Sequence, residues 1–181
     1  MATWTEITEN YRYDSEKTKD SELYSEKNAV IAFSELCVQE GGKKSAISDE
    51  VIYIDQVAKN KKTSQLPSTM DFLCGIGKLK KDHKNNKIFL SAPRYFLLGE
   101  FRFNYKNPYN IKASDISDKI SGTRSLLSED LSNIYQKCVF LFSDSCIQEA
   151  RNYFSRLNPG QTWIVITQKE FEFLFDKAVF V

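Results

Sequence analysis

The chain contains few of the residues from which nucleophilic and zinc sites are built. It has one histidine, His83, within the polar segment Lys80–Asn86, and four cysteines at 37, 74, 138 and 146. A Ser/His or Cys/His site needs a histidine beside the nucleophile. A zinc site needs closely spaced ligand pairs, and no two cysteines here are separated by two residues. We therefore predict buried free thiols and no bound metal.

The chain also lacks a long apolar run. Its longest apolar segments, Cys138–Phe142 and Trp163–Ile166, are far shorter than the roughly 20 residues that span a bilayer. The first residues show neither the basic nor the apolar region of a signal peptide. We expect a cytoplasmic protein with no membrane partner.

Common phosphate-binding and hydrolase motifs are missing as well. The chain has no Walker A sequence and no Gly-x-Ser-x-Gly, and Gly75-Ile76-Gly77 lacks the third glycine of a dinucleotide fingerprint. With 25 basic and 24 acidic residues, the whole chain is neither a strongly basic nucleic-acid binder nor an acidic tail. No cofactor is predicted.

The charge is unevenly distributed, however. Residues 1–40 carry four basic and nine acidic side chains, whereas residues 41–106 carry thirteen basic and six acidic ones. The middle third is therefore where we expect an anionic partner to bind. The alternative is that these lysines only solvate loops.

The 181 residues suffice for one domain, and we predict a single α+β domain over 1–181 with a mixed sheet. Residues 1–28 are polar and are expected to form a loop-rich N-terminal segment. Residues 29–38 fit a helix face and also a strand, with helix slightly preferred. Strands are predicted at 50–55, 87–90 and 95–105, and a short helix from Ser114 to Gly122.

The last third predicts a β-α-β-α order. Two buried strands, Cys138–Phe142 and Trp163–Ile166, each lead into a helix, and parallel pairing would cover both sheet faces. Ser145 with Gln148, and Thr167 with Glu170, have the spacing of capping boxes. The second box favours a helix over a strand for Phe171–Ala178.

The leading candidate site lies in the basic third, where arginine and aromatic residues alternate. Aromatic rings stack on bases, and arginine and lysine neutralise phosphates. This pattern predicts a non-catalytic module that binds a nucleotide or nucleic acid. The alternative is an ordinary amphipathic strand with core aromatics. The candidate residues are Arg94, Tyr95, Arg102, Tyr105, Lys106 and Arg124.

A second candidate lies where the two buried strands end. Ligands of open α/β sheets bind beyond the carboxyl ends of strands, and free N–H groups at helix starts attract anions. Ser143, Ser145 and Thr167 are therefore candidate anion contacts. The competing interpretation is that they only cap helices.

A rival hypothesis is a metal-dependent enzyme acting on nucleic acid or nucleotide. Asp55, Asp71 and Glu100, with Lys106, could supply the carboxylates and the lysine that such chemistry needs. Against this, Glu100-Phe101-Arg102 lacks the lysine two residues after the acid that a restriction-type core has. A third hypothesis, suggested by the 13% aromatic content, is a protein-interaction module or inhibitor with a protein partner.

Part of the chain resembles the bacterial and phage domains called nucleotide-modification-associated. In the second such family, an apolar run ending in serine precedes an aromatic pair and a glycine. The resemblance covers about residues 49–125 and implies a role in DNA modification or phage–host defence, with modified bases or nucleotides as ligands. It is carried by Asp49–Tyr53, Lys80–Asp82, Lys87–Ser91, Tyr95-Phe96, Gly99 and Gly122–Ser125.

Overall fold

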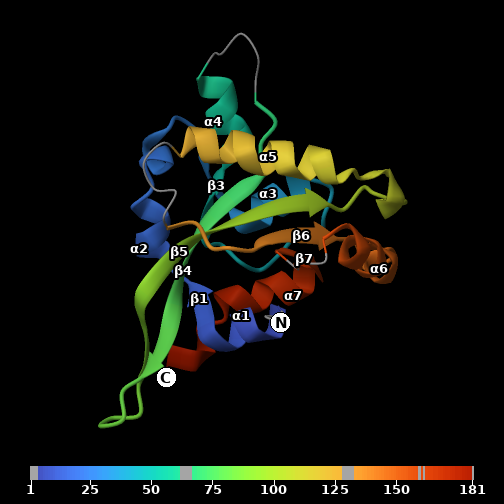
Figure 1. Cartoon of the computed structure of the whole chain (residues 1–181). Helices are drawn as coiled ribbons and strands as arrows, with labels where there is room; N and C mark the ends of the chain where they lie inside the picture. Colours follow the sequence, from blue (N-terminus) through green and yellow to red (C-terminus); the bar gives the residue numbers. More distant parts are fainter. Residues whose placement is uncertain (1–3, 62–66, 128–132, 159, 161, 181) are drawn as a thin grey trace.

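A mixed β-sheet lies between two layers of helices in the computed structural model, which describes residues 4–61, 67–127, 133–158, 160 and 162–180 (Figure 1). Neighbouring strands run antiparallel from β2 to β5 and parallel from β5 to β7. The predicted α+β class with a mixed sheet is confirmed. In sheet order the strands are β2 (Val30–Ala32), β3 (Glu50–Tyr53), β4 (Phe72–Lys81), β5 (Ile88–Arg102), β6 (Cys138–Phe142) and β7 (Trp163–Thr167), while β1 (Tyr11–Tyr13) pairs with the middle of β4.

Helices cover both faces of the sheet. Successive residues of a strand point to opposite faces, so neighbouring residues belong to different hydrophobic cores. Leu98 of β5 belongs to one core and its neighbour Leu97 to the other. The first core is covered by α4 (Ile54–Asn60), α5 (Ala113–Leu126) and α6 (Ile147–Leu157). The second is covered by α1 (Trp4–Asn10), α3 (Phe33–Gln39) and α7 (Gln168–Glu172). Within the described ranges, no helix is long and apolar enough to cross a membrane.

The C-terminal third has the predicted β-α-β-α order. Strands β6 and β7 pair in parallel, and α7 begins with the expected capping box between Thr167 and Glu170. The predicted preference for helix over strand holds at the start of Phe171–Ala178, but the extent is wrong: α7 ends at Glu172 and is followed by a 3-10 turn, η4 (Phe173–Phe175). The Ser145–Gln148 box is wrong. Helix α6 begins one residue later, after Cys146, which makes no side-chain cap.

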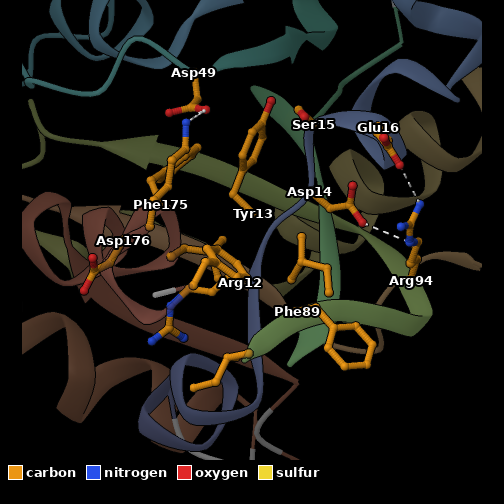
Figure 2. Close-up of a pocket in the computed structure, with 15 residues that line it drawn as sticks. Arg12, Tyr13, Asp14, Ser15, Glu16, Asp49, Phe89, Arg94, Phe175 and Asp176 are labelled. Atoms are coloured by element: carbon orange, nitrogen blue, oxygen red, sulfur yellow. Dashed lines mark hydrogen bonds and ion pairs between the residues drawn. The ribbon is translucent and has the colours of Figure 1, made fainter. Parts of the chain in front are cut away.

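The N-terminal segment is ordered rather than loop-rich, contrary to expectation. It forms α1, β1, α2 (Ser15–Lys19) and a 3-10 turn, η1 (Glu22–Ser25). Helix α2 lies against Gly75 of β4, where a Cβ atom would come within 2.5 Å of the Thr18 nitrogen. Arg94 of β5 fixes the same segment through ion pairs to Asp14 and Glu16 (Figure 2). These contacts are long-range, so local sequence patterns do not reveal them.

The ambiguous residues 29–38 contain both predicted structures. Val30–Ala32 pair with β3, and the helix α3 starts directly at Phe33. The predicted strand at 50–55 likewise ends at Tyr53, where α4 begins. In both places the chain turns from strand to helix without a linking loop, so one apolar run serves two elements.

The predicted gap between the strands at 87–90 and 95–105 is absent, and so is the predicted helix end at Gly122. β5 runs through Pro93 as one strand, because the β4–β5 register shifts between Gly77 and Lys78 and leaves Ala92 and Pro93 without partners in the ladder. It ends at Arg102, before the predicted boundary. Helix α5 runs through Gly122, where a Cβ atom would lie 2.1 Å from the Ser68 carbonyl oxygen. This glycine permits a close approach and does not stop the helix.

Short 3-10 turns follow β5 and η4, namely η2 (Pro108–Asn110) and η5 (Ala178–Phe180).

Candidate active site

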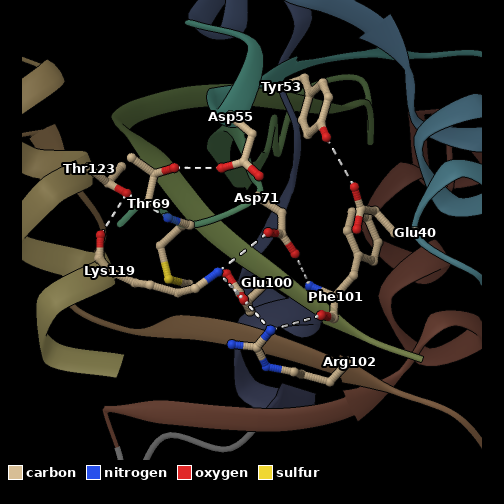
Figure 3. Close-up of polar contacts among 11 residues, drawn as sticks. Glu40, Tyr53, Asp55, Thr69, Asp71, Glu100, Phe101, Arg102, Lys119 and Thr123 are labelled. Atoms are coloured by element: carbon tan, nitrogen blue, oxygen red, sulfur yellow. Dashed lines mark hydrogen bonds and ion pairs between the residues drawn. The ribbon is translucent and has the colours of Figure 1, made fainter. Parts of the chain in front are cut away.

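Two buried carboxylates meet where β4 begins and β5 ends (Figure 3). Phe72 pairs with Gly99, so Asp71 and Glu100 lie on adjacent antiparallel strands next to each other. The backbone N–H of Phe101 donates to Oδ2 of Asp71 at 2.6 Å and fixes that carboxylate. This is also the carboxyl edge of the parallel strands, since Arg102 is in register with Phe142.

Two cations complete the group, which we call the buried charge cluster (Asp71, Glu100, Arg102 and Lys119). Nζ of Lys119, on α5, lies 2.6 Å from Oε1 of Glu100 and 3.7 Å from Oδ1 of Asp71. The Arg102 guanidinium approaches the same Glu100 oxygen at 2.6 Å and stacks over the Tyr105 ring, 4.9 Å from its centre. The helix and the strand therefore both direct positive charge at one carboxylate oxygen.

The second oxygen of Glu100 is a buried acceptor without a hydrogen-bond partner among the described residues. Glu100 has no exposed surface, and burial raises the pKa of its carboxyl group, opposed by Arg102 and Lys119. Burial and the adjacent Glu100 raise the pKa of Asp71 to about 8. Such perturbed carboxylates are typical of functional sites.

A small cavity lies beside Lys119, the one member of the cluster that lines it. It has a volume of about 270 Å³ and is lined by Asp55, Lys59, Thr69 and Lys119, among others. Asp55 accepts a hydrogen bond from the Thr69 hydroxyl at 2.6 Å, and its charge contributes to the raised pKa of Glu100. Another carboxylate near the cluster, Glu40, accepts a hydrogen bond from the Tyr53 hydroxyl at 3.2 Å.

The donor set suits a hard divalent cation held in part by its substrate. Within the part of the chain that the structure describes, no group of three or more His, Cys, Asp or Glu side chains is placed to hold a metal ion. Mg²⁺, however, is commonly bound by one or two carboxylates, with water and substrate phosphate oxygens as the other ligands. Asp71 and Glu100 meet that smaller requirement.

The structure brings together most of the carboxylates proposed for the enzyme hypothesis, but with a different lysine. Asp71 and Glu100 are adjacent and Asp55 lies beside them, whereas Lys106 is exposed and takes no part in the cluster's ion pairs among the described residues. Lys119 takes that place and was missed. Its signal was the apolar face of α5, because Lys119 falls in helical step with the inward-facing Ile116, Ile120 and Thr123.

The predicted nucleic-acid-binding residues do not form one surface. Arg94 and Arg102 are eight residues apart on β5, which is about 26 Å at the usual rise of a strand. Arg94 is paired with Asp14 and Glu16, and Tyr95 packs edge-on against Tyr11 and Tyr135. Only Arg102 and Tyr105 are brought together. Lys106 and Arg124 are both exposed.

The alternative anion site is partly assembled. The Ser143 and Ser145 hydroxyls lie 2.9 Å apart and, with Gln168 and the Gly41–Lys44 loop, line a cavity of about 590 Å³. Thr167 is committed to its capping box, since both its N–H and its hydroxyl bond to Glu170. Asp144 in the same cavity wall forms an ion pair with Lys43 at 3.3 Å and opposes an anion there.

Comparisons with family models, with curated proteins and with solved structures give no match. The resemblance to nucleotide-modification-associated domains therefore stays a prediction.

Proposed function

We propose that the chain is a divalent-cation-dependent phosphodiesterase acting on nucleic acid or a nucleotide, with the buried charge cluster as its reaction centre. One observation carries the proposal: Glu100 is fully buried beside Asp71, yet one of its oxygens has no hydrogen-bond partner among the described residues. An unpaired buried carboxylate oxygen is costly, and a cation ligand would remove that cost.

Each residue of the buried charge cluster has a separate role in the proposed reaction. Asp71 and Glu100 would hold the cation, with Asp71 oriented by the Phe101 N–H. A bound cation supplies charge neutralisation at a phosphate oxygen and lowers the pKa of a coordinated water. Arg102, held between Glu100 and the Tyr105 ring, keeps the Glu100 carboxylate in place. Lys119 is the cation positioned to transfer its hydrogen bond from Glu100 to a phosphate oxygen.

The proposed reaction is a hydrolysis. The oxygen of a water molecule bonds to phosphorus, and the P–O bond to the leaving alcohol breaks with its electron pair on that oxygen. The attacking water releases one proton to solvent, and the leaving oxygen takes one up. The cavity beside Asp55 reaches Lys119, where a phosphate oxygen would be held.

This proposal is preferred to the non-catalytic binding module because of the partners of two arginines. That hypothesis relied on Arg94 and Arg102, and both face carboxylates of the chain itself. The excess of lysine over residues 41–106 still supports an anionic substrate.

The test is hydrolysis of bis-p-nitrophenyl phosphate and of fluorescent DNA and RNA oligonucleotides, with Mg²⁺, with Mn²⁺ and with EDTA. We expect turnover that needs the cation and falls at least 100-fold in Glu100→Gln and in Asp71→Asn. Glu35→Gln, an exposed carboxylate on α3, is the matched control and should retain wild-type turnover. Equal turnover in Glu100→Gln and wild type, with both folded by circular dichroism, would refute the proposal. Binding of the oligonucleotides without any turnover would favour the non-catalytic module.

A further inference from the structure

The outer part of the β4–β5 hairpin projects from the body of the molecule as a two-stranded ribbon (Figure 1). We call residues 78–91 the basic arm. Lys78 is the last residue of β4 that pairs with β1, and beyond it β4 and β5 pair only with each other in the described structure, from Leu79–Leu90 to Lys81–Ile88. The arm ends in a turn at residues 82–87.

The arm carries five lysines against one carboxylate. Lys80, Lys81, Lys84 and Lys87 are exposed and Lys78 is half-buried, and none of the five forms an ion pair within the part of the chain that the structure describes. The single carboxylate, Asp82, accepts a hydrogen bond from the Lys84 N–H at 2.9 Å and so fixes the turn. The whole chain is nearly neutral, so this positive charge is a local feature.

The arm also presents an apolar side chain among its charges. Phe89 is 45% exposed and pairs with Lys80 across the ribbon, so the two side chains share a face. An exposed phenylalanine on a lysine-rich ribbon suits a partner that offers both phosphates and apolar groups. Duplex DNA has both, since thymine methyl groups line its major groove.

We infer that the basic arm binds double-stranded DNA, by entering its major groove and contacting the flanking phosphates. The major groove of B-DNA is about 12 Å wide and admits a two-stranded β-ribbon. The major groove of A-form RNA is too deep and narrow for side chains to read. Lysines contact phosphates without reading sequence, so the binding is expected to be sequence-independent.

The arm's role as a substrate-holding element rests on the proposed function, whereas its DNA binding does not. Asp71 and Lys80 are separated by nine residues along β4, or about 30 Å at the usual rise per residue. Stacked base pairs rise about 3.4 Å each, so a duplex that touches both the arm and the reaction centre needs at least about 9 base pairs.

The test is fluorescence anisotropy of a labelled 20-base-pair DNA duplex, titrated at several salt concentrations. The arm variant changes Lys80, Lys81, Lys84 and Lys87 to Gln. The control variant changes four exposed lysines elsewhere, Lys19, Lys27, Lys112 and Lys169, to Gln, and so has the same net charge. The melting temperature of each variant establishes that it is folded.

We expect the arm variant to bind at least 30-fold more weakly than wild type at low salt. Each lost phosphate contact should make the slope of log K against log salt shallower by about 0.9, so the slope should change by about 3 to 4 units. The control variant should keep the slope and most of the affinity. Equal losses in the two variants, or unchanged affinity in the arm variant, would overturn the inference. So would arm-dependent binding that favours duplex RNA or phosphatidylserine vesicles over DNA.

Two further measurements separate the inference from the proposed function. In the Glu100→Gln background, the four arm substitutions should still weaken duplex binding at least 30-fold. The arm variant should hydrolyse bis-p-nitrophenyl phosphate at the wild-type rate, because this small substrate does not reach the arm. Arm-dependent DNA binding without hydrolysis of any phosphodiester supports the arm and refutes the reaction centre. Cation-dependent hydrolysis, together with DNA binding that does not depend on the arm lysines, supports the reaction centre and refutes the arm.

Discussion

The Lys119 ammonium nitrogen lies 2.6 Å from Oε1 of Glu100 and joins the middle of α5 to the end of β5 beneath it. Lys119 is the only cation that also approaches Asp71 within the described ion pairs. Because the crossover helix and the hairpin strands meet at this contact, the cluster contributes to the fold as well as to the proposed reaction. The two contributions are separable by experiment.

The coupling between Lys119 and Glu100 is measurable by a double-mutant cycle. We expect Lys119→Met to lower the free energy of unfolding by about 2–4 kcal/mol, because it leaves a buried carboxylate with one cation fewer. In the Glu100→Gln background the same change should cost at least about 1 kcal/mol less. Urea unfolding of the four proteins at pH 7 gives both values, with Lys112→Met as the exposed control. Additive effects would show that the two side chains do not interact.

Gly75 is predicted to be essential for docking of the N-terminal segment. A Cβ atom at this position would lie 2.5 Å from the Thr18 nitrogen and 2.6 Å from the Asp14 carbonyl oxygen, both of which are backbone atoms. Gly75→Ala should therefore destabilise the protein by about 2 kcal/mol or more. Gly160→Ala, whose Cβ would meet nothing closer than 3.4 Å, should change stability by less than about 0.5 kcal/mol. Similar melting temperatures for the two variants would contradict this account of α2.

The capping box of α7 predicts a pH-dependent contribution to stability. Burial opposes ionisation of Glu170, but hydrogen bonds from Thr167 and Arg151 outweigh it and hold the pKa below its usual value of 4.5. A group whose pKa is lower when folded stabilises the protein above its unfolded pKa. That contribution is lost as the pH falls through the folded pKa.

Glu170→Gln should accordingly be less stable than wild type at pH 7, and the difference should shrink below about pH 4.5. Thr167→Ala, which removes the other half of the box, should lose about 1 kcal/mol at pH 7. Thermal melting between pH 3 and pH 7 measures both variants. A gap between Glu170→Gln and wild type that stays constant across this range would count against the capping-box contribution.

The sequence was most informative where structure is local. The buried runs of β6 and β7 and the Thr167–Glu170 box lie in short windows whose periodicity and capping residues determine the element. The N-terminal segment was mispredicted because its order depends on Gly75, some 60 positions away in the chain. Local patterns predict breaks near Pro93 and Gly122, because the roles of these residues, in a shifted ladder and in a close helix contact, exist only in the folded structure.

The candidate site likewise depends on both local residue types and long-range contacts. Asp71 and Glu100 could be named from residue type, but their adjacency depends on the β4–β5 register, which no short motif encodes. Lys106 is nearer to Glu100 in sequence than Lys119 is, yet it lies beyond the end of β5 and points into solvent. Arg94 and Arg102 share a strand, whereas their carboxylate partners come from the N-cap and first turn of α2 and from β5.

Calorimetric titration of Mn²⁺ into the wild-type protein and into Glu100→Gln tests the central claim most directly. The buried charge cluster predicts one site per chain in the wild type, lost in Glu100→Gln and retained in the exposed-carboxylate control Glu35→Gln. It also predicts that saturating Mn²⁺ raises the melting temperature of wild type and of Glu35→Gln but not that of Glu100→Gln. Equal binding by wild type and Glu100→Gln, or no binding by wild type at millimolar Mn²⁺, would contradict the assignment of a cation to Asp71 and Glu100.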